Sequence, residues 1–337
     1  MTHSVLFHER QHLGEIILNR PEAYNALSHD MILAITKQLH AWAQANSIQA
    51  VLIHTANEKA FCAGGDIKEI YKKGKTNLAS AIQFFADEYT LNALIAHYPK
   101  PYIALLNGLT MGGGVGISVY ASHRVSTERY LFAMPETGIG FFPDVGGSFF
   151  LSRCKENAGI YLGLTGARLQ AADAFALHLT DYVVQADTVS LIKQQLFSLP
   201  YYTHENIHAA LLPFHHTPPH HNLPLATIER CFGEPTMEAV LARLLSEKSA
   251  WATATHQTLQ TKSPLSLKVT LAQLQRGPSL DLTACLAMER GLTQHFLQGH
   301  DFYEGIRAAV LDKDQQPQWQ PPTLKAVSAA QVAAYFI

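Results

Sequence analysis

Short apolar segments alternate with amphipathic segments along the first half of the chain. Residues 4–9 and 13–19 alternate polar and apolar side chains, which predicts two strands joined by a turn. Ser28 is a suitable first residue for a helix. The residues that follow Ser28 repeat at helical spacing on one face: Met31, Ile32, Ile35, Leu39 and Trp42.

The same alternation continues toward residue 120. Strands are predicted at 49–55 and 101–108, a helix over 78–96, and a further helix that opens on the glycines of 111–122. Residues 58–71 lie between two of these elements and are predicted to form a loop. Strands that alternate with helices predict a layered α/β domain.

The pattern changes after about residue 190. Residues 198–224 are rich in proline and histidine and break the periodicity, whereas 225–260 and 264–311 have helical spacing. A short helix is predicted at the C-terminal end. The chain is therefore predicted to consist of a core domain, a linker with a helical segment, and a C-terminal helical region: residues 1–197, 198–260 and 261–337.

Composition narrows the classes of partner. The 337 residues are 47% hydrophobic and 15% charged, with a formal net charge of -2, so no basic surface indicates nucleic acid. No apolar run approaches the ~20 residues that span a bilayer, so no membrane partner is expected. The four cysteines are widely separated, which argues against a disulfide scaffold or a cysteine zinc site. We expect a cytoplasmic protein, since the N-terminus lacks the pattern of a signal or transit peptide.

Two glycine clusters each follow a predicted strand. The first, Cys62–Asp66, reads CAGGD, and the second, Met111–Gly116, reads MGGGVG. Glycine allows the backbone to approach a ligand closely, and a helix N-terminus presents unpaired N–H groups. Two such clusters at one point would form an oxyanion hole. Tight turns with close helix packing are the alternative interpretation.

Two acids lie in an apolar segment. Glu136 and Asp144 occur in FAMPETGIGFFPDVGG, next to Phe141 and Phe142. Burial raises the pKa of a carboxyl group and makes it a better acid or base near neutral pH. The alternative for each acid is a helix cap or a solvated charge.

Several motifs resemble one known family. NRPEAYNALS, AFCAGGDIKEIY, NGLTMGGGVGISV and FAMPETGIGFFPDVGG occur in the order found in the crotonase (enoyl-CoA hydratase/isomerase) superfamily. The last two motifs and GHDFYEGIRAAVLDKDQQPQW resemble its 3-hydroxyisobutyryl-CoA hydrolase branch. The resemblance runs from about residue 4 to 335 and is weakest over 198–260. It implies an α/β fold: a crotonase (ClpP-like) spiral of ββα units with a C-terminal helical region.

The resemblance also implies site residues. The backbone N–H groups of Gly65 and Gly113 would form the oxyanion hole for a thioester oxygen. Glu88, Gly113, Glu136 and Asp144 would contact the substrate, with Glu136 and Asp144 catalytic. A helix-surface salt bridge is the alternative for Glu88, and a solvated surface position is the alternative for Lys68. The residues implied to bind CoA are Ala63, Gly65, Asp66, Ile67 and Lys68.

One departure from the hydratases bears on the reaction. Hydratases of the superfamily carry a glutamate where this chain has Gly116, and a small residue where it has Asp144. Losing one acid and gaining another favours thioester hydrolysis over hydration. The implied substrates are 3-hydroxyisobutyryl-CoA and also 3-hydroxypropionyl-CoA, in valine catabolism, with no metal and no cofactor besides the CoA of the substrate. A hydratase or isomerase, and a non-catalytic acyl-CoA-binding protein, remain alternatives.

Three further points stay open in the sequence. Glu136 would either attack the thioester carbonyl directly, giving an anhydride, or activate a water molecule. The histidines of FHHTPPHH, residues 214–221, suit a metal site or a solvated loop, and we favour the loop because prolines separate them. Members of the superfamily often form trimers or dimers of trimers, which favours a homo-oligomer here; the alternative is that the longer C-terminal part of this chain covers that surface.

Overall fold

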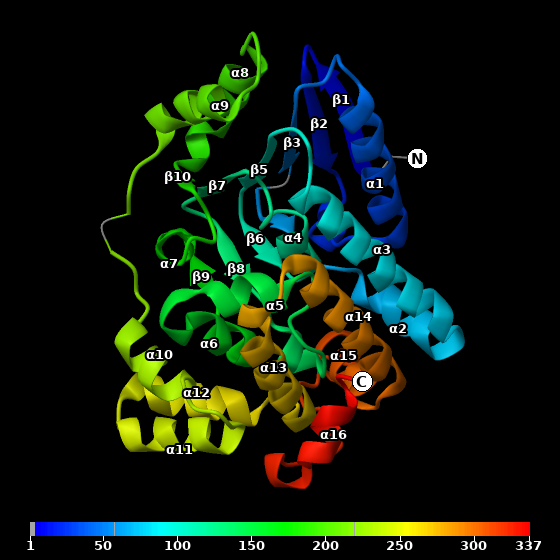
Figure 1. Ribbon diagram of the computed structural model, residues 1–337, viewed down its shortest axis with the longest axis vertical. Helices are drawn as coiled ribbons and strands as arrows, with labels where there is room; N and C mark the ends of the chain where they lie inside the picture. Colours follow the sequence, from blue (N-terminus) through cyan, green and yellow to red (C-terminus); the bar gives the residue numbers. More distant parts are fainter. Residues whose placement is uncertain (1–3, 57, 219) are drawn as a thin grey trace. The chain divides into compact units, whose positions relative to one another are not determined.

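The computed structural model describes residues 4–56, 58–218 and 220–337 (Figure 1). The chain forms two compact units, and each unit combines segments that are distant in sequence. Unit 1 comprises Met1–Gly65, Thr90–Phe132 and Leu169–Leu223. Unit 2 comprises Asp66–Tyr89, Ala133–Arg168 and Pro224–Ile337. The predicted boundaries at residues 197 and 260 follow the order of the sequence rather than this packing, and they stay a prediction.

Unit 1 is built on a six-stranded sheet. Its order is β1-β2-β3-β5-β7-β10, and β1 is antiparallel to β2 while the remaining pairs are parallel (Figure 1). Pairing of Val5 with Leu18 and of Arg10 with Leu13 confirms the predicted strand pair. The strands are β1 (Val5–Arg10), β2 (Leu13–Leu18), β3 (Ala50–Thr55), β5 (Tyr102–Leu106), β7 (His123–Thr127) and β10 (Tyr182–Val184).

A second sheet has four short strands in the order β4-β6-β8-β9. They are β4 (Ala60–Cys62), β6 (Leu109–Met111), β8 (Leu131–Ala133) and β9 (Leu169–Gln170). β4 lies in the segment predicted as a loop, so that prediction was wrong. A strand of three residues has too few positions to display a period in sequence.

The helices of unit 1 include the one that the sequence predicted best. In α1 (His29–Gln44), the N–H of Met31 donates to the Ser28 hydroxyl at 3.3 Å, which caps the helix. All five predicted apolar positions of α1 are buried. The other helices are α4 (Gly113–Gly116), α7 (Ala171–Ala176), α8 (Val189–Phe197) and α9 (His204–Leu211), and α3 (Leu78–Ala96) runs through both units.

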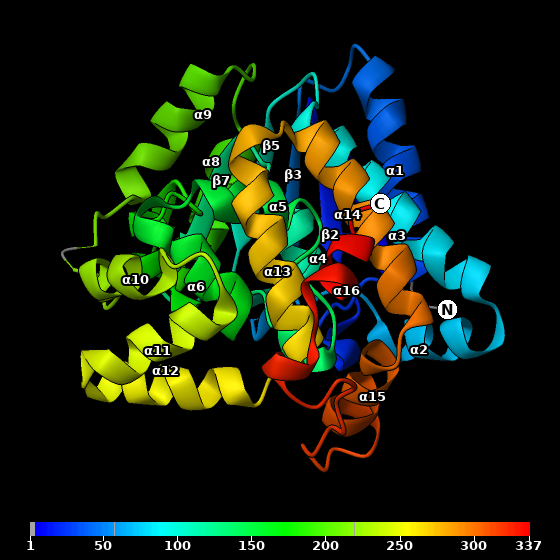
Figure 2. The same cartoon turned by 60° about the horizontal axis from the view of Figure 1, so that its bottom comes forward.

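Unit 2 is mainly helical. α10 (Leu225–Phe232), α11 (Met237–Glu247) and α12 (Ala250–Gln260) pack together beside α6 (Ala158–Thr165), and α13 (Pro264–Arg276) lies against α16 (Ala329–Ala334) (Figure 2). α2 (Ile67–Thr76) begins inside the segment 58–71 that was predicted as a loop, so the prediction was also wrong there. The other helices of unit 2 are α5 (Gly147–Phe150), α14 (Leu282–Gln298) and α15 (Asp301–Ile306). Within the described part of the chain, no helix combines the length and apolar character needed to cross a membrane.

Part of the segment predicted as a linker packs into unit 1. Tyr202, Ile207 and Leu211 are buried in the hydrophobic core that also contains Leu52 and Ile103 of the six-stranded sheet. Apolar residues at positions 207 and 211 are one helical turn apart on α9. The nearby prolines and histidines obscured this spacing.

Several histidines contribute to the packing of unit 1. The rings of His123 and His204 stack with centroids 5.3 Å apart, and the hydroxyl of Tyr182 lies 2.7 Å from Nδ1 of His208. The N–H of Val183 donates to Nδ1 of His215 at 3.0 Å, so one histidine of the Pro-rich segment supports the sheet. Among the residues that the structure describes, no group of three His, Cys, Asp or Glu side chains is placed to hold a metal.

We expect acid to destabilise the protein through His123. Burial, together with the neighbouring His204 and His208, lowers the pKa of His123 to about 4, and Asp181 opposes this shift. The unfolded chain takes up a proton near pH 6.5, so between pH 6.5 and 4 it binds more protons than the folded one and stability falls. Going from pH 7 to pH 5 should cost about 1–2 kcal/mol through this group.

Urea unfolding at both pH values measures this effect. His123→Gln should show a smaller loss between pH 7 and pH 5 than the unmodified chain, because it removes the titrating ring. An equal loss in both proteins would show that His123 does not carry the effect.

The four cysteines form no disulfides. Cys62, Cys231 and Cys285 are buried, and Cys154 is half-buried. Burial raises the pKa of Cys154 to about 12 and that of Cys285 to about 11. The absence of disulfides agrees with the prediction from their wide spacing in the sequence.

Candidate active site

The two glycine clusters lie against each other in unit 1. Gly64 has φ +105°, and a Cβ there would lie 3.2 Å from the carbonyl oxygen of Met111 and 3.6 Å from the amide nitrogen of Gly113. A Cβ on Gly114 would lie 2.8 Å from Cβ of Cys62 and closer still to its carbonyl oxygen. Glycine is therefore required at Gly64 by the backbone conformation and at Gly114 by space.

The amide groups of these clusters are held in a defined backbone. Leu27 N–H donates to the carbonyl of Gly64 at 2.8 Å, which fixes the loop before Gly65. Gly113 is the first residue of α4, so its N–H has no acceptor within the helix. α4 is a single turn that ends at Gly116, shorter than the helix predicted over 111–122. Assignment of Gly65 and Gly113 as oxyanion donors stays a prediction, and the close packing agrees with it.

The three acidic side chains implied as site residues, Glu88, Glu136 and Asp144, lie in unit 2 and are buried. Glu136 begins a 3-10 turn over Glu136–Ile139, Asp144 follows it, and Glu88 lies on α3. Their exposed fractions are 7%, 5% and 2%. A solvated charge is therefore wrong for Glu136 and Asp144, and a surface salt bridge is wrong for Glu88. One oxygen of Glu88 and one of Glu136 have no hydrogen-bond partner among the described residues.

The three carboxyl groups interact electrostatically. Burial raises the pKa of Glu88 and of Glu136 well above the usual value, and the charge of Asp144 raises both further. Burial also raises the pKa of Asp144 to about 7, although the Tyr89 hydroxyl lowers it by donating a hydrogen bond. Like charges this close do not all ionise together at neutral pH. The group can therefore hold and release protons in the range where an enzyme works.

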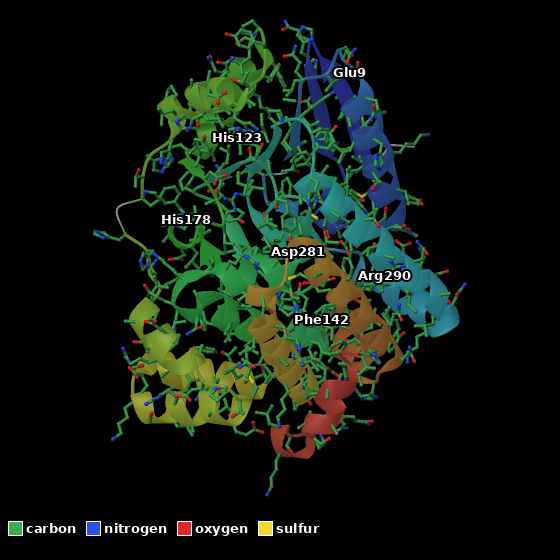
Figure 3. The ribbon with its side chains drawn as sticks, in the orientation of Figure 1. Glu9, His123, Phe142, His178, Asp281 and Arg290 are labelled. Carbon is green, nitrogen blue, oxygen red and sulfur yellow. The ribbon has the colours of Figure 1, made fainter. Side chains whose placement is uncertain are left out.

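Aromatic side chains provide the apolar surroundings. The ring of Phe141 lies 5.2 Å from Phe85, 4.5 Å from Phe142 and 5.3 Å from Phe302. Phe142, labelled in Figure 3, lies beside Phe296 of α14. Helices α13, α14 and α15 pack around this segment (Figure 2). Burial of the carboxyl groups in this apolar part of unit 2 accounts for their raised pKa values.

Sequence reasoning missed the residues that support Asp144. Tyr89 donates to the Asp144 carboxylate at 2.9 Å. Glu289 of α14 accepts hydrogen bonds from the N–H groups of Gly146 and Ser148, at 2.7 and 2.8 Å, and from the Ser148 hydroxyl at 2.6 Å. Burial raises the pKa of Glu289 to about 8. Glu289 lies on the apolar face of α14 with Cys285 and Leu286, and an acid at such a position is a signal that could have been noticed.

The residues implied to bind CoA lie at the start of α2. Asp66 caps this helix, since the N–H of Glu69 donates to its carboxylate at 3.1 Å. Ala63 and Ile67 are half-buried, and Lys68 is exposed. Asp66 therefore has a structural role, and the CoA contacts of all five residues stay predictions.

Comparison with known proteins identifies close relatives. The family model described as enoyl-CoA hydratase/isomerase matches residues 13–336. The 3-hydroxyisobutyryl-CoA hydrolase, mitochondrial, of Danio rerio is 43% identical over 333 residues, covering 96% of this chain and 87% of the relative. The protein of the same name from Homo sapiens is 40% identical over 340 residues, with 98% and 88% covered.

Solved structures confirm the predicted fold. A carnitinyl-CoA dehydratase from Mycobacterium thermoresistibile superposes with a TM-score of 0.93 at 37% identity, covering 100% of this chain and 97% of the other. An enoyl-CoA hydratase from Rhodobacter sphaeroides 2.4.1 gives 0.90 at 35%, covering 99% and 97%. The names disagree on chemistry, because the curated relatives are hydrolases and the two solved structures are named for adding or removing water.

Proposed function

Because the chain belongs to the enoyl-CoA hydratase/isomerase family, we propose that it hydrolyses the thioester of 3-hydroxyisobutyryl-CoA to 3-hydroxyisobutyrate and CoA. The observation that carries this proposal is the buried pair Glu136 and Asp144 in a chain that has glycine at position 116. Hydrolases of this name are about 40% identical over nearly the whole chain, which supports the same conclusion. 3-Hydroxypropionyl-CoA lacks one methyl group and should be a second substrate, since one methyl discriminates by only about 1–3 kcal/mol.

In the proposed reaction, the N–H groups of Gly65 and Gly113 donate to the thioester oxygen as it becomes negative. Each such donor typically contributes ~2.7–4 kcal/mol to the transition state. Glu136 acts after it has lost its proton: its carboxylate either attacks the carbonyl carbon, giving an anhydride that water then opens, or takes a proton from an attacking water. The C–S bond breaks in both routes, and the thiolate leaves readily because its conjugate acid has a pKa of about 8.5. Asp144 orients the 3-hydroxyl group or exchanges protons with the reacting groups.

A screen of thioesters tests the proposal. Purified protein is mixed with short acyl-CoAs, with and without a 3-hydroxyl, and free CoA is followed with a thiol reagent. Rapid release from 3-hydroxyisobutyryl-CoA and slow release from isobutyryl-CoA are expected. Binding of these compounds without turnover would instead support the non-catalytic alternative.

Hydration of a double bond is the second candidate, and the names of the two solved structures favour it. Gly116 supplies no carboxylate at the position where hydratases carry one of two glutamates. Incubation with crotonyl-CoA separates the candidates, because a hydratase removes the conjugated absorbance. We expect that absorbance to persist.

Asp144→Asn should reduce hydrolysis. The amide keeps the shape of the side chain but loses the charge that accepts the Tyr89 hydrogen bond. We expect kcat/KM for 3-hydroxyisobutyryl-CoA to fall about 10²-fold. Comparison with isobutyryl-CoA identifies the role: a smaller loss there indicates that Asp144 holds the 3-hydroxyl, and an equal loss indicates proton exchange. Unchanged kcat/KM for both substrates would contradict any role in the reaction.

The cellular setting stays a prediction. A free 3-hydroxy acid suits a step in branched-chain amino acid breakdown, and valine catabolism is the pathway that we propose. The sequence predicts a cytoplasmic protein, whereas the curated relatives are named as mitochondrial. A homo-oligomer is proposed from the resemblance, and size-exclusion chromatography with light scattering tests it.

A further inference from the structure

A chain of hydrogen bonds runs from Asp144 into α14. Tyr89 Oη donates to Oδ2 of Asp144 at 2.9 Å and lies 2.8 Å from Oγ1 of Thr293. Thr293 Oγ1 in turn lies 2.9 Å from the carbonyl oxygen of Glu289, to which it can donate. Tyr89 is 4% exposed and Thr293 is 1% exposed, so bulk water does not compete for these groups.

The hydrogen bonds that join Asp144, Tyr89 and Thr293 can be arranged in two ways that leave no hydrogen unpaired. Each hydroxyl carries a single hydrogen. With Asp144 ionised, Thr293 donates to Tyr89 and Tyr89 donates to the carboxylate. With Asp144 protonated, the carboxyl donates to Tyr89, Tyr89 donates to Thr293, and Thr293 donates to the carbonyl of Glu289. Either arrangement gives every hydrogen in the chain an acceptor.

We propose that Tyr89 is a positioning residue for Asp144, and that the Tyr89–Thr293 hydroxyl pair reverses its hydrogen bonds when Asp144 gains or loses a proton. The part that concerns catalysis rests on the proposed function. The reversal of the hydrogen bonds rests on the contacts of Tyr89 alone. The pair would let Asp144 change protonation state during turnover without leaving a buried donor unpaired. Such an unpaired group would otherwise disfavour one of the two states.

Hydrogen bonds hold the backbone of the turn that carries Asp144, so reversal of the hydrogen bonds requires no backbone movement. Val145 and Gly146 both have positive φ, at 51° and 80°, and the N–H of Gly147 donates to the carbonyl of Asp144 at 2.7 Å. A β-branched residue rarely adopts this conformation. The carboxyl of Glu289 holds the turn through the amides of Gly146 and Ser148.

Tyr89 opposes the effect of burial on Asp144, which lies among three other carboxyl groups. Glu88, Glu136 and Glu289 all interact with Asp144 through like charge. Burial and the charge of Asp144 raise the pKa of all three glutamates, whereas burial is what raises the pKa of Asp144 itself, and Tyr89 favours the ionised form of Asp144 by donating a hydrogen bond. Burial and the charge of Asp144 raise the pKa of Tyr89 well above its usual value, so the phenol keeps its proton and stays a donor.

Two single substitutions should shift the titration of Asp144 in opposite directions. Tyr89→Phe removes the donor to the ionised form, and a bond to a charged acceptor is about twice as strong as a neutral one. Thr293→Val leaves that donor but removes the acceptor that Tyr89 needs when Asp144 is protonated. The pH at which Asp144 titrates should therefore rise by about one pH unit in Tyr89→Phe and fall by a similar amount in Thr293→Val.

The first readout is the pH profile of kcat/KM for CoA release between pH 5 and 9. Asp144→Asn identifies the limb that belongs to this residue, and that limb should move up in Tyr89→Phe and down in Thr293→Val. The second readout needs no activity: the side-chain carboxyl resonance of Asp144 in ¹³C-aspartate-labelled protein, assigned by its absence in Asp144→Asn. If the protein hydrolyses no thioester, but the titration of the Asp144 resonance moves in opposite directions in Tyr89→Phe and Thr293→Val, the proposed function is rejected. The hydrogen-bond reversal then still stands.

Matched variants distinguish this role from general loss of packing. Tyr303→Phe also removes one phenol hydroxyl in unit 2, which donates to the carbonyl of Leu297 at 2.8 Å, and it should leave the Asp144 titration unchanged. Thr293→Ser retains the hydroxyl and should restore the titration of the unmodified protein. Shifts in the same direction in Tyr89→Phe and Thr293→Val, or no shift in either, would overturn the proposal.

Discussion

Glu136→Gln should abolish CoA release from 3-hydroxyisobutyryl-CoA, with kcat at least about 10³-fold lower. An amide neither attacks a thioester carbonyl nor takes a proton from water, so both proposed routes stop. The substitution should preserve the fold, because one Glu136 oxygen has no partner among the described residues and burial already disfavours the charge. A thiol reagent measures the released CoA.

Thermal unfolding of Glu136→Gln and the activity of a second variant are the controls. The thermal midpoint of Glu136→Gln should stay close to that of the unmodified protein, since the raised pKa of Glu136 already favours the uncharged acid and the amide has a similar size. Glu205→Gln changes an exposed glutamate of α9 and should leave kcat unchanged. If Glu136→Gln retains turnover while correctly folded, Glu136 is not the residue that drives attack.

Gly114→Ala should impair both catalysis and stability. The new methyl group would lie 2.8 Å from Cβ of Cys62 and 3.0 Å from its carbonyl carbon, so α4 or β4 must shift. Because Gly113 begins α4, its N–H shifts with the helix. Loss of one oxyanion donor lowers kcat about 10²–10³-fold, and we expect a loss of this size.

Gly291→Ala is the matched control, because among the described residues no heavy atom outside the adjacent part of α14 lies within 4 Å of the position of its new methyl group. This residue lies within α14, where alanine should be neutral or stabilise by up to about 1 kcal/mol. Thermal unfolding and kcat are measured for both variants. Normal kcat in Gly114→Ala would mean that the N–H of Gly113 does not act in the reaction.

Sequence patterns predicted the elements that are determined by residues close together in the chain. α1 was predicted with its cap and its buried face because capping and periodicity involve residues only a few positions apart. The glycine clusters and the acid pair were visible because glycines and charges are unusual in their surroundings. β4 and α2 were missed, since they share a short segment dominated by glycine and charged residues.

Long-range partners could not be predicted from one sequence. Glu289 meets Gly146 across 143 positions, and Thr293 meets Tyr89 across 204. No periodicity links residues at such separations, and only the tertiary fold brings them together. The chemistry of Asp144 depends on them, so sequence reasoning identified the acid but not what controls its proton.

The buried cysteines make the assay of this protein simple. A thiol reagent reacts with the thiolate, and with a pKa of about 12 only roughly one Cys154 side chain in 10⁴ is ionised at pH 8. Cys285, with a pKa of about 11, is ionised in roughly one molecule in 10³. Cys62 and Cys231 are buried as well. Colour that develops promptly in the native protein should therefore report released CoA, and a slow later rise should report unfolding.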